Sequence, residues 1–325
     1  MRPVILDMDP GVDDALAILL ALRSPELEVK AITVVSGNIK LDLCVKNVLR
    51  VLDILGIDDD SAPIVAAGSE RPIRKDPLNV PSIHGCDGLG GLYRFHEADG
   101  SIRYPEPKRK PSSVPAVDVI LDSVDRFARN LAIIATGPLT NIAQAIMRDS
   151  KTMRKIGEMI IMGGAFKEPG NITPVAEFNA YVDPDALQIV LDSGISPLTI
   201  VGLDVTHKAR LYKYYLYKRV CDSKNKVTQF VQDCTEFYMN FHKENEGFDG
   251  CYLHDPLAVG VAIWPELVKT QSLHVQVETY GRLTAGMTIA DFRSRRSLSD
   301  KPNANVCMDV NADEFLKRFS ERVLR

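Results

Sequence analysis

Four carboxylates occur close together near the start of the chain, in the octapeptide Asp-Met-Asp-Pro-Gly-Val-Asp-Asp at residues 7–14. The Pro-Gly pair predicts a tight turn between an apolar strand and a helix. Alternation along a strand places Asp7 and Asp9 on the same side, and the turn brings Asp13 and Asp14 back toward them. Like charges ~4 Å apart near a protein surface repel by about 4 kcal/mol. Because a domain is held together by only ~5–15 kcal/mol, several such pairs favour a bound cation that removes the repulsion.

A simpler interpretation of the octapeptide is that its carboxylates are solvated turn residues and helix caps. Asp13 or Asp14 can cap the next helix, whose N-terminal dipole favours an anion. Capping alone explains one Asp. If a metal is bound, ligands that are all oxygen select a hard ion, Ca²⁺ or Mg²⁺, with Mn²⁺ as a further candidate.

The elements that must position this cluster are short β-branched runs alternating with segments of helical period. Each predicted strand is apolar nearly throughout, which is typical of strands covered on both faces in a parallel sheet. We therefore predict an α/β fold, an open, mostly parallel, doubly wound sheet flanked by helices. The predicted strands span residues 3–6, 29–35, 63–66, 131–135, 158–162 and 198–203, and the predicted helices span residues 14–22, 41–55, 116–128, 141–147, 184–193 and 312–323.

Three longer segments depart from this rhythm, but no repeat or linker divides the chain, so we predict a single domain over residues 1–325. Residues 68–115 are rich in Pro, Gly and charge, and a loop this long in a compact domain is usually functional or mobile. A largely helical insertion is predicted at about residues 211–250. The tail at residues 273–310 shows the alternation of strands.

Polar side chains recur where other predicted strands end. In open α/β sheets this carboxyl edge is where ligands bind. The second strand runs into Ser36-Gly37-Asn38, the fourth into Thr136-Gly137-Pro138, and the fifth into Met162-Gly163-Gly164. Further polar groups follow at Asn171, Glu177, Asn179 and His254-Asp255-Pro256. The recurrence weakens the interpretation of the octapeptide as caps alone.

The composition of the chain argues against several classes of function. A formal net charge of -4 and a pI near 5.9 give no basic field, so we expect neither nucleic acid nor an anionic membrane as a partner. The apolar runs are shorter than the roughly 18 residues that span a bilayer, and no export signal is visible at the N-terminus. Six scattered cysteines without a C-x-x-C pair fit reduced thiols. We expect a cytoplasmic protein.

These residues, taken in order, resemble the inosine-uridine-preferring nucleoside hydrolases over nearly the whole chain. Eight motifs in register carry the resemblance, which makes it far more specific than a single DxD. They are the acidic segment Asp7 to Ala15, Gly37-Asn38, His84-Gly85, Thr136 to Asn141, Met162-Gly163-Gly164, Ala176 to Asn179, His254-Asp255-Pro256, and Leu283 to Met287 followed by Asp291-Phe292-Arg293.

The resemblance implies a homo-oligomeric enzyme, a dimer or tetramer, that hydrolyses ribonucleosides and holds one Ca²⁺ per subunit. By position, the metal ligands would be Asp9, Asp14, the backbone carbonyl of Thr136, and Asp255. The residues that bind the ribose hydroxyls would be Asp13, Asn38, Asn171, Glu177 and Asn179. Asp7 would not bind the metal itself but would support the residues that do.

One departure from the family's pattern concerns the leaving base. Members often carry an aromatic residue, commonly Tyr, about a dozen residues before the His-Asp-Pro motif, and here that position falls near His242. We expect His242 to contact the substrate, and also His84 on its glycine-flanked loop. His254 matches the position beside the leaving base in members that accept purines.

The chemistry of the implied reaction assigns roles to these residues. Cleaving a C1′–N bond leaves positive charge on the sugar and negative charge on the base. Asp9, touching both ion and water, is placed to take the proton of the attacking water. Ionised carboxylates stabilise the positive charge that develops on the sugar ring. His254 is the expected general acid, because an unperturbed imidazole titrates near pH 6.5.

Two alternatives stay open at this point. A haloacid-dehalogenase-like Mg²⁺-dependent phosphohydrolase also starts with an apolar strand and a DxD, but it would need a downstream Lys and a later acidic pair. A calcium-dependent nucleoside- or sugar-binding protein without turnover would need neither the base Asp9 nor the acid His254. A turnover assay separates an enzyme from a binding protein.

Overall fold

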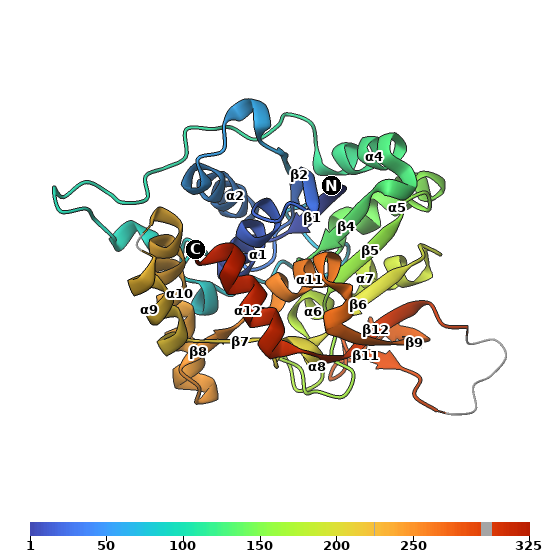
Figure 1. Cartoon of the computed structure of the whole chain (residues 1–325). Helices are drawn as coiled ribbons and strands as arrows, with labels where there is room; N and C mark the ends of the chain where they lie inside the picture. The colour runs from blue at the N-terminus through green and yellow to red at the C-terminus, as the bar shows by residue number, and fades with distance from the viewer. Residues whose placement is uncertain (224, 294–300) are drawn as a thin grey trace.

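The structure, a computed structural model, describes residues 1–223, 225–293 and 301–325. Its centre is an eight-stranded sheet with helices on both faces (Figure 1). The strands follow the order β3-β2-β1-β4-β5-β6-β12-β9, and all neighbours are parallel except β12 and β9. Their bounds are β1 (Arg2–Met8), β2 (Leu27–Val34), β3 (Ile64–Ala67), β4 (Ala132–Ala135), β5 (Glu158–Met162), β6 (Leu198–Val201), β9 (Val268–Leu273) and β12 (Ala304–Val310).

Two apolar cores lie on the two faces of the sheet. One core is formed with α1 (Val12–Leu22), α2 (Leu41–Leu55), α11 (His254–Ile263) and α12 (Ala312–Val323). The other is formed with α4 (Ala116–Phe127), α5 (Thr140–Met153) and α7 (Pro184–Asp192). The helix α1 is buried from Val12 to Ala21, because it packs against α2, α11 and α12 as well as the sheet. Such all-round burial explains why its sequence is apolar on nearly every side.

The remaining elements surround the carboxyl edge of the sheet. The insertion consists of α9 (Lys213–Asp222) and α10 (Lys226–Glu246), bracketed by the antiparallel pair β7 (Arg210–Tyr212) and β8 (Gly250–Tyr252). Short helices α3 (Pro81–His84), α6 (Phe178–Val182) and α8 (Leu203–Thr206) lie in the loops, and β10 (Val275–Val277) pairs with β11 (Thr288–Ala290). In the described residues no helix is long and apolar enough to cross a membrane.

The predicted fold class is confirmed, and the differences lie at element ends. The helix α1 begins at Val12, two residues before the predicted start, because Gly11 is its N-cap and donates its N–H to Asp14 Oδ2 at 2.9 Å. The helix α5 runs to Met153 instead of residue 147, with a non-helical residue at Asp149. The strand β6 ends at Val201, because the chain turns into α8.

The long loop at residues 68–115 is tied to the helical insertion. Asp233 on α10 accepts hydrogen bonds from the Arg103 guanidinium and the Tyr104 hydroxyl, both at 2.8 Å. The Asp87 carboxylate accepts three backbone N–H groups of the loop, those of Leu89, Gly91 and Leu92. These bonds place the loop and α10 together beside the carboxyl edge of the sheet.

The strand order places a topological switch at β1. Its neighbour β2 leads into α2 on one face, and its other neighbour β4 leads into α5 on the opposite face. The loops that follow these strands therefore separate, and a crevice opens between them at the carboxyl ends. The octapeptide at residues 7–14 lies at this crevice.

Candidate active site

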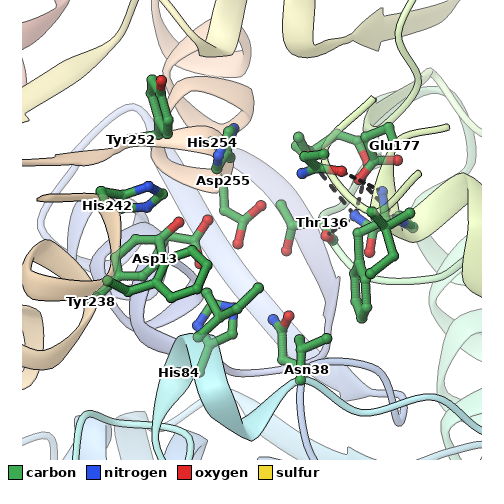
Figure 2. Close-up of a pocket in the computed structure, with 18 of the residues that line it drawn as sticks. Asp13, Asn38, His84, Thr136, Glu177, Tyr238, His242, Tyr252, His254 and Asp255 are labelled. Atoms are coloured by element: carbon green, nitrogen blue, oxygen red, sulfur yellow. Dashed lines mark hydrogen bonds between the residues drawn. The ribbon is translucent and has the colours of Figure 1, made fainter. Parts of the chain in front are cut away.

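A pocket opens at the crevice between the strand ends and α10 (Figure 2). Its polar part is lined by Asp13, Asn38, Thr136, Asn171, Glu177, Asn179 and Asp255. Its aromatic part is lined by His84, His207, Tyr238, Phe241, His242, Tyr252 and His254, together with Glu246. All the residues predicted from the sequence to bind the substrate line this pocket, and so does His254. The predicted ligands Asp9 and Asp14 are buried beneath it and do not line it.

Four buried aspartates form an acidic floor, of which Asp13 and Asp255 line the pocket and Asp9 and Asp14 are buried next to them. Asp13, Asp14 and Asp255 each offer an oxygen, and these atoms lie within 4.8 Å of one another. Burial and the charge of Asp14 raise the pKa of Asp13 to about 7. Burial and the neighbouring aspartates also raise the pKa of Asp255 well above its ordinary value. The folded chain therefore holds these acids together against their mutual repulsion.

Asp9 lies against two glycines. Its Oδ2 accepts the backbone N–H of Asn38 at 2.7 Å, whereas its Oδ1 is buried and has no hydrogen-bond partner among the residues that the structure describes. A Cβ at Gly37 would lie 2.1 Å from Oδ2, and one at Gly137 would lie 2.8 Å from Oδ1. Only glycine at these two positions allows the loops after β2 and β4 to approach the carboxylate so closely. Burial, then the charge of Asp14, raises the pKa of Asp9 well above its ordinary value.

Asp14 and Thr136 connect α1 to the end of β4. The Thr136 hydroxyl donates to Asp14 Oδ1 at 3.0 Å, and the Asn38 side-chain amide donates to Asp14 Oδ2 at 3.1 Å. The Thr136 carbonyl, a predicted metal ligand, accepts the Asn179 side-chain amide at 2.7 Å. One lone pair of that carbonyl oxygen is left for another partner.

These features fit a divalent cation. The donor set is all oxygen, three of its carboxylates lie within reach of a single ion, and Asp9 Oδ1 is a buried acceptor without a partner. Leaving such an acceptor unpaired is costly, and hard cations such as Ca²⁺ and Mg²⁺ prefer oxygen ligands of this kind. Asp13, which was predicted to bind the sugar, belongs to the compact acidic cluster along with the predicted ligands Asp14 and Asp255.

Glu177 has a second role that the sequence did not indicate. Its carboxylate caps α6, accepting the backbone N–H groups of Asn179 at 2.8 Å and Ala180 at 3.0 Å. It also accepts the Gly164 N–H at 3.0 Å. The side chain is buried, and these bonds hold the loop after β5 next to the pocket. At the pocket rim, the Asn171 side-chain oxygen accepts the Phe178 N–H at 2.9 Å.

Asp7 does not line the pocket. Its Oδ1 accepts the Thr33 hydroxyl at 2.5 Å and the Asn141 side-chain amide at 2.9 Å. Asn141 in turn accepts the Ser69 N–H at 2.8 Å. Burial raises the pKa of Asp7 to about 7. The carboxylate therefore joins β1, β2, α5 and the start of the long loop behind the cluster.

His84 is fixed as a neutral ring on the long loop. Its Nδ1 accepts the backbone N–H of Val12 at 3.2 Å, so in the neutral ring the proton is on Nε2. Burial and the charge of His242 lower the pKa of His84 to about 3. The ring stacks on Tyr238 with centroids 5.2 Å apart. A Cβ at Gly11 would lie 2.6 Å from His84 Nδ1, which explains the glycine in the acidic turn.

His254 begins α11 beside the acidic floor. Its Nδ1 lies 2.8 Å from the Thr206 hydroxyl, and its ring contacts the rings of Tyr252 and His207. Burial lowers the pKa of His254 well below its ordinary value, and so do the neighbouring histidines, so the expectation of an imidazole with an unperturbed pKa is wrong for this ring. The hydrogen bond to Thr206 fixes the ring plane.

His242 extends from α10 into the pocket, between Tyr252 and Tyr238 (Figure 2). Its Nδ1 lies 3.0 Å from Glu246 Oε1, one helical turn later. The family's usual tyrosine is absent at this position, but Tyr238 stands one turn earlier, with its ring centroid 4.5 Å from that of His242.

Sequence reasoning missed part of the aromatic end. Tyr238, Phe241, Glu246 and Tyr252 were not predicted, although all line the pocket. Tyr238, His242 and Glu246 are spaced at four-residue intervals, which is typical of one face of a helix, so the spacing could have identified Tyr238 and Glu246 from the predicted His242.

Comparison with known proteins identifies the family of this chain. The family model described as inosine-uridine preferring nucleoside hydrolase matches residues 4–317. The pyrimidine-specific ribonucleoside hydrolase RihA of Citrobacter koseri is 40% identical over 322 residues, which cover 99% of this chain and 97% of that protein.

Solved structures give the same result. The purine-preferring ribonucleoside hydrolase from Gardnerella vaginalis superposes with a TM-score of 0.89 at 36% identity, covering 99% of this chain and 98% of that one. A plant nucleoside hydrolase superposes with a TM-score of 0.89 at 31% identity, covering 99% of both chains. Neither the phosphohydrolase nor the non-catalytic binding protein is supported by these relatives. The chain belongs to the inosine-uridine preferring nucleoside hydrolase family, and it is an enzyme that cleaves ribonucleosides to ribose and free base.

Proposed function

We propose that hydrolysis takes place in the pocket of Figure 2, with Asp9 as the base, His254 as the acid and a single Ca²⁺ held by Asp9, Asp14, Asp255 and the Thr136 carbonyl. The observation that carries this proposal is the buried acidic floor, in which Asp9 Oδ1 has no partner. When bound there, calcium would lower the pKa of a water molecule and so prepare the nucleophile.

Asp9 is suited to receive the proton of that water. Its Oδ2 accepts the Asn38 N–H, so the orientation of the carboxylate is fixed, and Oδ1 is the oxygen available both to the ion and to a proton of the water that the ion would hold. A general base must be held within hydrogen-bond reach of the proton that it accepts. The ionised side chains of the floor also stabilise the positive charge that develops on the sugar ring.

The polar part of the pocket is proposed to hold the ribose. Asp13, Asn38, Asn171, Glu177 and Asn179 line it and are the candidates for bonding the sugar hydroxyls. Because three backbone N–H groups already occupy the Glu177 carboxylate, we propose that Glu177 offers the sugar only its remaining lone pair. Asn179 donates to two backbone carbonyls, so its side-chain oxygen is the atom available to a hydroxyl.

The aromatic part is proposed to hold the base. His254 and His84 present ring nitrogens there, and Tyr238, Phe241 and Tyr252 offer aromatic surface to a planar base. A pyrimidine-specific relative and a purine-preferring relative are both similar to this chain. We therefore propose activity on ribonucleosides as a class. Assembly into a homo-oligomer is proposed on the family resemblance.

The test is a turnover assay on the calcium-loaded protein. Inosine, adenosine, guanosine, uridine and cytidine are supplied separately, and ribose and free base are measured for each. We expect equimolar ribose and base from at least one nucleoside. Release of neither product from any of the five, by folded protein with calcium bound, contradicts the proposal.

A further inference from the structure

The aromatic end of the pocket contains an ion pair that the proposed mechanism does not use. Glu246 is the only acidic side chain that lines the aromatic part, as far as the described residues show. Its Oε1 lies 3.0 Å from His242 Nδ1. The side chain of His242 is 5% exposed, whereas that of Glu246 is 38% exposed. Glu246 therefore connects a buried imidazole to the mouth of the pocket.

The second ring nitrogen of His242 has no hydrogen-bond partner in the described part of the chain. Nε2 is buried and makes no hydrogen bond, although the ring lines the pocket. A carboxylate can only accept, so the proton on the Glu246 side must be on Nδ1. A buried nitrogen left without a partner is costly, which indicates that a ligand atom satisfies it when the pocket is filled.

The surroundings of this ring are the Glu246 carboxylate on one side and aromatic rings on the others. Burial raises the pKa of Glu246, but the hydrogen bond from His242 and the charge of that ring bring it below its ordinary value. Tyr252 also bonds the Glu246 carboxylate. Four aromatic rings pack around His242, those of Tyr238, Phe241, Phe248 and Tyr252. They hold the imidazole in place without offering its Nε2 a hydrogen bond.

We propose that His242 donates a hydrogen bond from Nε2–H to the departing base, and that Glu246 is the positioning residue that orients the ring by accepting its Nδ1–H. The inference rests on the proposed function of the pocket. Negative charge on a departing base spreads over several ring nitrogens and exocyclic oxygens, so it offers more than one acceptor. His254 on α11 and His242 on α10 approach from different elements and can serve different acceptors. No proton is transferred from His242, which stays bound to Glu246.

Loss of the His242 donor should slow only those substrates whose leaving group needs a hydrogen bond to depart. Hydrogen bonds to charged groups correspond to roughly ten- to a hundredfold in rate. His242→Phe keeps an aromatic ring in the cluster but removes the donor, so kcat on a ribonucleoside should fall by about that factor. Hydrolysis of p-nitrophenyl riboside should change by less than about threefold, because p-nitrophenolate leaves without such assistance.

Two further variants distinguish donation from packing. His242→Gln places an amide N–H near the position of Nε2 and should recover part of the nucleoside rate. Glu246→Gln keeps a hydrogen-bond acceptor for Nδ1 but removes the charge, so it should lower nucleoside kcat in the same direction and spare p-nitrophenyl riboside. Glu244→Gln is the matched control, the same change on an exposed side chain of α10, and should alter neither substrate.

The outcomes separate this inference from the proposed function. If the wild-type enzyme releases ribose and base but His242→Phe retains full nucleoside activity, the donor role is wrong while the proposed function stands. Equal losses of activity on both substrates, with no recovery in His242→Gln, also overturn the donor role, because they show that His242 only packs the pocket. Failure of the wild-type enzyme on every nucleoside contradicts the proposed function instead.

Discussion

If the acidic floor holds calcium as proposed, adding calcium should stabilise the folded protein against heat. Three carboxylates have oxygens within 4.8 Å of one another, and at an effective dielectric of 20 each ionised pair at that distance repels by about 3.5 kcal/mol. Calcium at about 1,000 times its Kd stabilises the folded state by about 4 kcal/mol. For a chain of this size, at about 2 °C per kcal/mol, Tm should rise by about 8 °C.

The same carboxylates determine how the stability of the folded state depends on pH. Burial and repulsion raise the pKa of Asp13 to about 7, so between about pH 4 and 7 the folded state binds more protons than the unfolded state. The metal-free protein should therefore lose stability as the pH rises through that window. Because calcium competes with protons for these oxygens, the calcium-induced gain in Tm should be larger at pH 8 than at pH 5.5.

Thermal unfolding measured with chelator and with excess calcium, at both pH values, is the assay. Asp14→Asn should lose most of the calcium response, whatever its own Tm, because Asp14 belongs to the cluster. Asp60→Asn, on an exposed aspartate, should respond like the wild type. A wild-type Tm that does not change with calcium at pH 8, or a full response in Asp14→Asn, would refute the reasoning.

Three further substitutions test the surroundings of the cluster. Gly37→Ala puts a Cβ 2.1 Å from Asp9 Oδ2, so it should displace that carboxylate and reduce both calcium affinity, measured by calorimetry, and kcat; a variant with wild-type values would show that Asp9 can move freely. Glu177→Gln replaces an acceptor of three backbone N–H groups by an amide, so it should lower the free energy of unfolding, measured in urea, by about 2–3 kcal/mol. A raised KM at unchanged stability would instead show that Glu177 is only a sugar ligand. His254→Ala should reduce nucleoside hydrolysis by ~10²–10⁴-fold and largely spare p-nitrophenyl riboside; equal losses on both substrates would show that His254 only orders the site.

The acidic floor could be predicted because its signals are local. Asp9, Asp13 and Asp14 occur in one turn, and Asn38 and Thr136 follow strands whose carboxyl ends must meet at one edge of a parallel sheet. Strand alternation and helix-capping preferences act over a few residues, so they are readable from the sequence.

The parts that were not predicted depend on packing between distant segments. Tyr238 stacks on His84 only because the loop at residues 68–115 is bound to α10 through Asp233. The third backbone hydrogen bond to the Glu177 carboxylate comes from Gly164, thirteen residues earlier in the chain. Neither the depth of Asp9 beneath the pocket nor the cap role of Glu177 has a signal in residue type or spacing.

The most direct test of the account compares wild-type protein with Asp9→Asn. Both are loaded with calcium, the metal content is measured, and the release of ribose from the best nucleoside substrate is followed. The wild type should turn over, and Asp9→Asn should keep its fold but lose kcat by about 10²–10⁴-fold or more, because an amide cannot accept the water's proton. An Asp9→Asn enzyme that holds calcium and retains kcat within about tenfold of the wild type would contradict the assignment of Asp9 as the base.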